Sequence, residues 1–503
     1  MSFKSSHYKI GTALLLIFSC FFSFQVNVLA VSNNVEQTIH KLDKEIEANM
    51  RTHDIPGMAF AWVTKEKGLY TEGFGLLEIN EEAAVNEQTN FLLGSLSKVF
   101  VTLAVLQLQE QGKLDVEQPL VHYLPWFTTD DTTISNQITV RHLLNHSSGL
   151  PDRLNMHDAV SLDKEDRIKQ MIQKLSNVSL THSPGEGYEY TNMNTDLLQV
   201  LIEETTGEPF TSYMEEHIFK PLGMERTGYF SYNNSHLTNS AIGHRYHWGR
   251  LKPYNESLSY ATSGSAGLSS NVDDLAKFIG YLLNEDEGST GLQLSRKSML
   301  QMFQPNQYGS GFNWYVTPHN IYMEGGLPGM TSTLVLAADR SFGLVLLSNS
   351  KQDITLNSGF NLYRIIAGGS PSTLLVADYP KISSITKLIM LVTLFVTLAL
   401  ALLVASMIIS LWKGSRTLRF KKPSGMSWIT IGILSIVYMV MLVYIYVYLP
   451  FEIGVPTLYD YHKDPDIVQG LTIFLIMLTV LMFTAIFRIL FFNKAPLHKQ
   501  GRI

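Results

Sequence analysis

Cysteine is almost absent from this chain of 503 residues. The one cysteine, Cys20, lies inside an N-terminal apolar run, and the bulky Phe18 and Phe22 around it do not fit a lipoprotein attachment site. We interpret Cys20 as apolar filler, so a mature protein without this segment has no cysteine. That composition excludes disulfides and thiolate metal sites, and we expect no metal or other cofactor.

An excess of positive charge is also missing. The chain has 38 Lys and Arg against 44 Asp and Glu, a net charge of −6, and no long basic or acidic tract. Nucleic-acid-binding domains usually carry a basic patch or stripe. We therefore expect no nucleic-acid partner.

Three long C-terminal runs lack any Asp, Glu, Lys, Arg or His, and they cover about 388–412, 428–448 and 467–487. Each is long enough to cross a hydrocarbon core of about 30 Å. Transporters and proton relays usually place ionisable groups inside such segments. The sequence therefore favours a multi-pass anchor in a lipid bilayer, while a role of the spans in substrate access stays open.

The charges between the spans predict their orientation. The loop after the first span and the C-terminal tail are basic, whereas the loop after the second span is mainly acidic. The positive-inside rule places the basic loop and the C-terminus in the cytoplasm, and everything before 388 outside the cell membrane. The basic residues are Lys413, Arg416, Arg419, Lys421 and Lys422 in the loop, and Arg488, Lys494, Lys499 and Arg502 in the tail.

The N-terminus predicts the same orientation independently. Lys4 and Lys9 precede an apolar run that ends near Phe24, and Ala30 offers a small-residue cleavage site. This is the pattern of a secretory signal peptide over 1–30. The alternative is an uncleaved N-terminal anchor, which would also place the following domain outside the cytoplasm.

The remaining residues, 31–370, form the predicted extracytoplasmic domain, and a linker over 371–387 leads to the membrane region 388–503. Strands are expected at 57–63, 68–75, 331–337 and 342–347, and mainly helices over 139–285. This order predicts an α/β (α+β) fold. Its antiparallel sheet combines N- and C-terminal strands, helices flank the sheet, and a helical subdomain is inserted.

A candidate nucleophile lies at the start of a predicted helix. Ser95 and Lys98 are three residues apart, so their side chains share one face of the helix. A partly buried lysine can lose its proton near neutral pH and act as the base that a serine nucleophile needs. Taken alone, such a pair is far more often a helix start with an exposed lysine than a catalytic pair.

A second pair is Tyr190 and Asn192, in a predicted loop before a helix. A phenol beside an ammonium is expected to have a lowered pKa, so Tyr190 could move protons between Ser95 and a leaving group. Asn192 could donate to a substrate carbonyl and steady Lys98. The structural alternative is a turn with a packed tyrosine, and the spacing of Tyr188 to Asn192 does not fit the pair.

With these motifs the chain resembles the serine β-lactamase and penicillin-binding protein superfamily, in its class C β-lactamase-like branch. Ser-x-x-Lys is the superfamily signature, and the branch adds Tyr-x-Asn. The stretches 138–151, 221–224 and 266–270 also resemble family motifs, and the resemblance runs from about Leu42 to Asn349. It implies Ser95, Lys98 and Tyr190 as catalytic residues. It needs no histidine base, so His142 and His146 are interpreted as packed or hydrogen-bonding residues.

The third family motif differs in this chain. Where the family has Lys-Thr-Gly or His-x-Gly, the sequence has Met323, Glu324 and Gly325, followed by Gly326. By resemblance, the N–H groups of Gly326 and Ser95 would form an oxyanion hole, with Glu324, Gly325 and Gly326 in the substrate site. The missing cation puts recognition of a substrate carboxylate in doubt, and Glu324 would favour a cationic or amine-bearing substrate.

The expected function is that of an exported, membrane-anchored serine hydrolase. It would act through an acyl-enzyme on peptides containing D-amino acids, peptidoglycan-like fragments, or related amides and esters. Three alternatives stay open: a prodrug-activating peptidase that removes an N-acyl-D-amino-acid cap in natural-product maturation, a β-lactamase, and a non-catalytic receptor acylated by β-lactams. The sequence does not predict the oligomeric state.

Overall fold

The computed structural model describes residues 35–494, apart from 66–67, 153, 155–163, 230–238, 248–249, 257, 285–290, 293, 351–353, 374–378, 419, 421, 423, 445–447 and 449–464. The predicted signal peptide and most of the acidic loop lie outside these residues. The chain divides into two compact units. The large unit comprises 1–243 and 255–375, and the C-terminal unit comprises 244–254 and 376–503.

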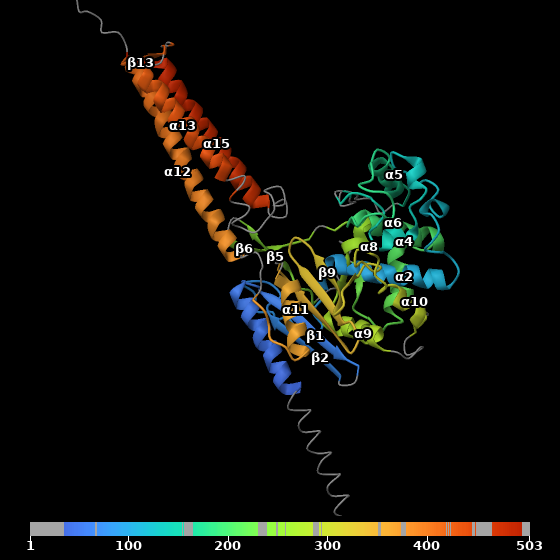
Figure 1. Cartoon of the computed structure of the whole chain (residues 1–503). Helices are drawn as coiled ribbons and strands as arrows, with labels where there is room; N and C mark the ends of the chain where they lie inside the picture. The colour runs from blue at the N-terminus through green and yellow to red at the C-terminus, as the bar shows by residue number, and fades with distance from the viewer. Residues whose placement is uncertain are drawn as a thin grey trace, which may run out of the picture. The chain divides into compact units, whose positions relative to one another are not determined.

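The large unit is organised around one antiparallel sheet of order β2-β1-β11-β10-β9-β8 (Figure 1). As predicted, one sheet combines early and late strands: β1 pairs with β11, so that Met58 lies opposite Ser348 and Thr64 opposite Phe342, and β2 pairs with β1 at the edge. The bounds are β1 Gly57–Thr64, β2 Gly68–Gly75, β8 Tyr315–Val316, β9 Asn320–Gly326, β10 Thr331–Ala337 and β11 Phe342–Ser348.

Helices cover both faces of this sheet. Side chains alternate between the faces of a strand, so Val345 and Leu347 join the main core beside α9 (Val272–Leu283), while Leu344 and Leu346 are equally buried on the other face. That second face is covered by α11 (Ile354–Ile366). A helix over 35–52 lies beside α11 (Figure 1), and the Asn49 amide donates to Ser358 Oγ at 3.2 Å.

The helical region predicted for the middle of the chain is present next to the sheet. The helix expected from Ser95 begins as a 3₁₀ turn, η1 (Gly94–Ser97), and continues as α2 (Lys98–Glu110). Helix α6 (Asn192–Thr206) packs against α2 and ends at Gly207, which has φ +75°. The other helices are α3 Thr132–Ser135, α4 Val140–Leu144, α5 Lys164–Leu175, α7 Phe210–Met214, α8 Ser263–Ala266 and α10 Arg296–Gln301.

Short elements complete this region. A small sheet of order β3-β7-β4 consists of β3 (Phe91–Leu92), β7 (Leu268–Ser270) and β4 (Gly228–Tyr229). Strand β3 comes just before η1 in the chain, so its pairing with β7 fixes the entry to the Ser95 turn. The remaining helical turns are η2 Leu120–His122, η3 Glu215–Phe219 and η4 Tyr260–Thr262.

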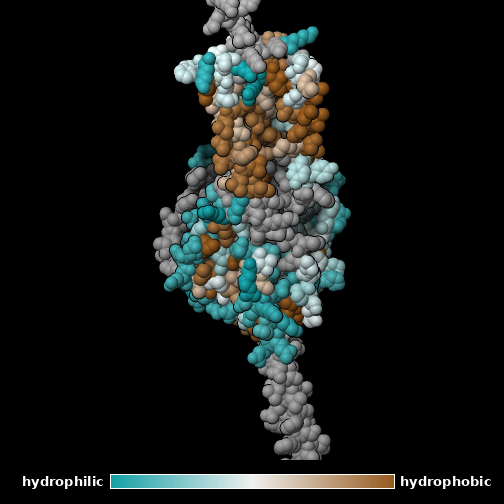
Figure 2. Space-filling view, turned by 90° about the vertical axis from the view of Figure 1, so that its left-hand side faces the viewer, coloured by the Kyte–Doolittle hydropathy of each residue, from teal (hydrophilic) through white to brown (hydrophobic). Residues whose placement is uncertain are grey.

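The C-terminal unit contains three long apolar helices, α12 (Tyr379–Trp412), α13 (Gly425–Val443) and α15 (Pro465–Phe491). Segments of 26, 19 and 20 residues in them are long and apolar enough to cross a membrane. Figure 2 shows the continuous hydrophobic surface of these helices. A hairpin of β5 (Gly243–His247) and β6 (Arg250–Tyr254), and a pair of short strands, β12 (Arg416–Leu418) and β13 (Phe492–Lys494), belong to this part of the chain.

One buried side chain joins the ends of the large unit. Asn349, directly after β11, accepts from the Gly57 N–H at 2.8 Å and donates to the carbonyls of Leu76 and Leu77, both at 3.0 Å. A buried backbone group that loses its partner costs about 1–3 kcal/mol. Closure of the sheet by N- and C-terminal strands therefore depends in part on this amide.

We expect Asn349→Ala to lower the free energy of unfolding of the large unit by about 2–4 kcal/mol, because the Gly57 N–H and the Leu76 carbonyl lose the partner that Asn349 supplies, whereas the Leu77 carbonyl still accepts from the Ile242 N–H. Denaturant titration of the full-length protein in detergent, followed by tryptophan fluorescence, measures the change. The matched control is Asn136→Ala at an exposed position. Equal midpoints for the two variants would contradict the role assigned to Asn349.

Candidate active site

The η1 turn presents Ser95. Gly94 has φ +56°, and a Cβ there would lie 2.8 Å from the Gly326 nitrogen, so only glycine permits this approach. Ser95 is the only residue between 91 and 100 that is not buried. The neighbouring Ser97 is buried: its Oγ donates to the Gly94 carbonyl and accepts from the Leu268 N–H. The two serines of the turn therefore differ in accessibility.

Lys98 is fully buried directly after this turn. Its Nζ lies 2.9 Å from Ser95 Oγ, 2.9 Å from Asn192 Oδ1 and 2.7 Å from the Ser265 carbonyl oxygen. The structure thus brings together Ser95, Lys98 and Asn192, as the sequence predicted. The Ser265 carbonyl was not predicted, because a backbone group carries no sequence signal.

The buried setting of Lys98 changes its proton affinity. Burial lowers the pKa of the lysine well below its ordinary value, and the nearby carboxyl of Asp196 partly opposes this shift. A neutral amine 2.9 Å from a serine hydroxyl can accept its proton. The arrangement therefore permits general-base activation of Ser95.

Asp196 is the charged group that the sequence analysis missed. It follows Asn192 by four residues, so both lie on one face of α6. Asp196 is fully buried, neither carboxylate oxygen has a well-aligned hydrogen bond within the described residues, and burial raises the pKa of the carboxyl. The four-residue spacing from Asn192 could have indicated that Asp196 lies on the same face of the helix as the site. It was not enough to predict burial, because Asp side chains in helices are usually exposed.

Tyr190 lies on the other side of the serine. The Lys98 Nζ is 5.1 Å from the centroid of its ring, the ring packs on His146 at 4.4 Å, and its hydroxyl is hydrogen-bonded to Ser95. The expectation of a lowered pKa is wrong for this tyrosine. Burial raises the pKa of the phenol, and this outweighs the lowering by the Ser95 hydrogen bond. Tyr190 therefore keeps its phenol proton near neutral pH.

The two histidines of the 138–151 stretch, His142 and His146, both form hydrogen bonds to neighbouring residues. His146 is buried, and its ring nitrogens contact Asn313 at 3.0 Å and Asn194 at 3.1 Å. Burial lowers the pKa of His146 to about 3, so its ring is neutral. His142 caps α4 through reciprocal hydrogen bonds with Thr139. Both therefore support the site structurally.

Strand β9 lies against the serine turn. A Cβ on Gly325 would lie 1.9 Å from the Leu93 carbonyl oxygen, so η1 and β9 meet where no side chain fits. Leu327 donates to Met330 at 2.8 Å, which makes Gly326 and Thr331 a non-hydrogen-bonded pair. The Gly326 N–H consequently points away from β10, and its nitrogen is adjacent to Gly94.

Side chains alternate along β9, so Met323, at the expected position of the family's lysine or histidine, and the following Glu324 lie on opposite faces of the strand. Met323 is 2% exposed and belongs to the main core, whereas Glu324 lies on the exposed side of the strand. Glu324 is close enough to Tyr190, Tyr315 and Tyr322 to raise the pKa of each. The position next to the serine turn is therefore acidic and aromatic.

Comparisons with known proteins show the family of this chain. A family profile described as Beta-lactamase matches residues 42–360. Protein flp of Staphylococcus aureus strain MW2 is 28% identical over 63% of the chain, and the chain spans 64% of that protein. The putative penicillin-binding protein PbpX of Bacillus subtilis strain 168 is 28% identical over 66% of the chain and 81% of that protein.

The fold is that of solved β-lactamase-type structures. A class C beta-lactamase superposes with a TM-score of 0.58 at 18% identity, over 67% of this chain and 98% of that one. The antiparallel sheet built from N- and C-terminal strands, with its flanking helices, is therefore a β-lactamase fold.

We expect Asp196→Asn to move the pH dependence of Ser95 acylation toward lower pH. Asp196 opposes the lowering of the Lys98 pKa, so its removal lowers that pKa further and leaves more neutral lysine in acid. The rate below neutral pH, relative to the plateau, should rise several-fold. Intact-protein mass spectrometry with β-lactams and activated esters measures it. Asp273→Asn on α9 is the control, and an unchanged or alkaline-shifted profile for Asp196→Asn would refute the coupling.

Proposed function

Because the chain belongs to the Beta-lactamase family, which includes serine hydrolase and penicillin-binding protein domains, we propose that it is an exported, membrane-anchored serine hydrolase. It acts through an acyl-enzyme on peptides that contain D-amino acids, or on related amides and esters. The observation that carries this proposal is the buried Lys98 amine, 2.9 Å from the one accessible serine of its turn.

The proposed reaction uses the contacts around Ser95. As Ser95 Oγ attacks the substrate carbonyl, Lys98 takes the hydroxyl proton, and the Tyr190 phenol protonates the leaving amine or alkoxide. Asn192 holds Lys98 through Oδ1, which leaves its amide nitrogen for a substrate carbonyl. Water then attacks the acyl-enzyme, gives up a proton to the same groups, and releases the acid and Ser95.

Negative charge on the carbonyl oxygen needs two donors. The Gly326 N–H points away from β10 beside the serine turn, and the Ser95 N–H is the second candidate donor of the proposed oxyanion hole. Loss of one such donor typically costs about 100- to 1,000-fold in rate. Gly325 supports the site because, without a side chain, it allows β9 to lie directly against the serine turn.

Membrane insertion and orientation are part of the proposal. The basic loop after α12 and the acidic loop before α15 favour a cytoplasmic C-terminus and an extracytoplasmic large unit. The signal pattern over 1–30 supports the same side. A substrate from the cell wall or the extracytoplasmic space fits this location.

A second candidate is the removal of an N-acyl-D-amino-acid cap from a natural-product precursor. The buried Met323 supports it, because such a substrate has no terminal carboxylate for a cation to bind at this position. An N-acyl-D-Asn peptide in the substrate panel tests it directly. Cleavage after the capped residue, with no cleavage of D-Ala-D-Ala peptides, would favour this candidate.

We expect Ser95→Ala to lower turnover of any true substrate by at least about a thousandfold, and Lys98→Met by at least about a hundredfold. Liquid chromatography with mass spectrometry on a panel of D-peptides, β-lactams and esters measures products and Ser95 adducts. The control is Ser176→Ala outside the site. Undiminished turnover by Ser95→Ala would place the nucleophile elsewhere, and a stable adduct without any turnover would favour the receptor alternative.

We also expect Glu324 to set a preference for substrate charge. Glu324→Gln should reduce the preference for an amine-bearing substrate over a matched carboxylate by roughly two- to fivefold, the size of a partly exposed ion pair. The ratio of kcat/KM values for the matched pair is the measurement, and Glu82→Gln is the control at an exposed position. An unchanged ratio would exclude this role.

A further inference from the structure

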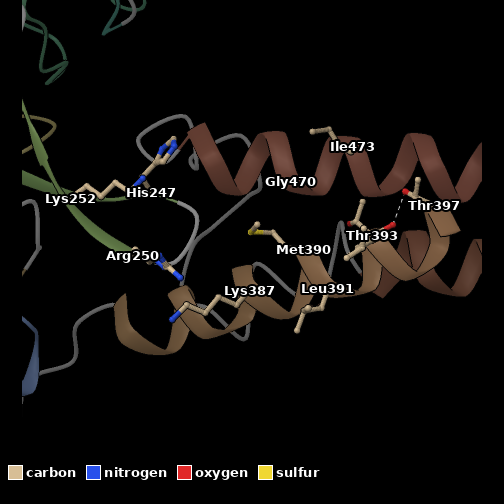
Figure 3. Close-up of a pocket in the computed structure, with 11 residues that line it drawn as sticks. His247, Arg250, Lys252, Lys387, Met390, Leu391, Thr393, Thr397, Gly470 and Ile473 are labelled. Atoms are coloured by element: carbon tan, nitrogen blue, oxygen red, sulfur yellow. Dashed lines mark hydrogen bonds between the residues drawn. The ribbon is translucent and has the colours of Figure 1, made fainter.

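The C-terminal unit contains a cavity of about 820 Å³. The β5–β6 hairpin forms one end of it, and α12 between Lys387 and Thr397 together with the start of α15 form the rest (Figure 3). This is the volume range of a small-molecule site. No residue of the candidate active site lines it.

One end of the cavity is cationic. Arg250, Lys252, His247 and Lys387 gather there (Figure 3), and the lining residues include no Asp or Glu. Within the described part of the chain, Arg250, Lys252 and Lys387 have no ion pair or hydrogen bond from their side chains. The hairpin sequence 243–254 contains no acidic residue. Three like charges brought together with no counter-ion among the residues that the structure describes favour an anion between them.

The other end is apolar. Met390, Leu391 and Leu394 of α12 line it, together with Gly470 and Ile473 of α15. Two threonines of α12 also line this end, but their hydroxyls donate to the carbonyls four residues earlier at 2.7 and 2.8 Å, so they do not offer a free donor to the cavity. The surface between the two helices therefore fits a hydrocarbon chain.

The two ends lie at the depths that an inserted lipid would require. Lys387 is the first residue of the first candidate span, and the lining residues on α12 continue to Thr397. Ten residues of helix cover about 15 Å, which is half of a hydrocarbon core of about 30 Å. The apolar part thus matches one leaflet, with the cations at its polar surface.

We propose that this cavity binds one anionic phospholipid of the extracytoplasmic leaflet. Arg250, Lys252 and Lys387 hold the phosphate of its head group, and one acyl chain lies between α12 and α15 along Leu391 and Leu394. The inference rests on the proposed membrane insertion, and it does not depend on the reaction at Ser95.

Native mass spectrometry of the full chain, released from detergent after equilibration with phosphatidylglycerol or phosphatidylcholine, tests the proposal. Wild-type protein should retain one phosphatidylglycerol in preference to phosphatidylcholine, and inorganic phosphate should not displace it. The triple variant Arg250→Gln, Lys252→Gln, Lys387→Gln should bind phosphatidylglycerol on the order of a hundredfold more weakly, given the attraction of three basic residues to an anionic lipid. Equal retention of both lipids, or full retention by the triple variant, would overturn the proposal.

Two matched controls distinguish binding in the cavity from nonspecific attraction of the anionic lipid to basic residues elsewhere on the protein. The double variant Lys413→Gln, Lys422→Gln removes two cations from the loop after α12 and should retain phosphatidylglycerol as the wild type does. If it lost as much lipid as the triple variant, the binding would be nonspecific electrostatic attraction and the proposal would be overturned. Leu394→Trp fills the cavity and should weaken binding at least several-fold, whereas Leu398→Trp, one turn further along α12, should not; the reverse result would exclude the acyl-chain position. Carbonate extraction of membranes tests insertion separately, so its failure is distinguishable from failure of the lipid site.

Discussion

The burial of one lysine amine is the constraint on which the rest of the large unit depends. A charged or polar nitrogen removed from water is costly unless its hydrogen bonds are replaced. For Lys98 the replacements come from Ser95 on its own turn, Asn192 at the start of α6 and the carbonyl of Ser265 on α8. These residues are 170 positions apart at most, so the helical insertion between the strands must be folded before the site exists.

Strand β9 separates the backbone geometry that the serine turn needs from the side chains that stand beside that turn. The glycines at the end of β9 allow the serine turn to approach the strand. This steric requirement does not depend on which side chains occupy positions 323 and 324. Because side chains alternate along a strand, Met323 fills the core while Glu324 takes the exposed side. Met323 therefore fills its place in the core without a cavity, and the charge of Glu324 stays on the exposed face beside the serine turn.

Sequence reasoning was successful where a feature is local or periodic. The four main strands, the turn at Ser95 and the apolar helices follow from alternation, spacing and length, and the juxtaposition of Ser95, Lys98 and Asn192 follows from motifs. It failed where long-range burial decides. Asp196 has no motif, the pKa of Tyr190 depends on the exclusion of water around it, and the hairpin over 244–254 has no sequence signal that assigns it to the C-terminal unit.

That hairpin also affects how the two units are joined. The chain leaves the large unit at Gly243, returns at Asn255, and leaves again after Leu375. Three covalent connections therefore link the units. A single linker at the end of the large unit would give only one such connection. A protease that cuts between 375 and 376 leaves the hairpin attached to the large fragment and the helices on the other. Release of the large unit would then also require the hairpin to dissociate from α12 and α15, so the noncovalent contacts around the cavity act as a second tether.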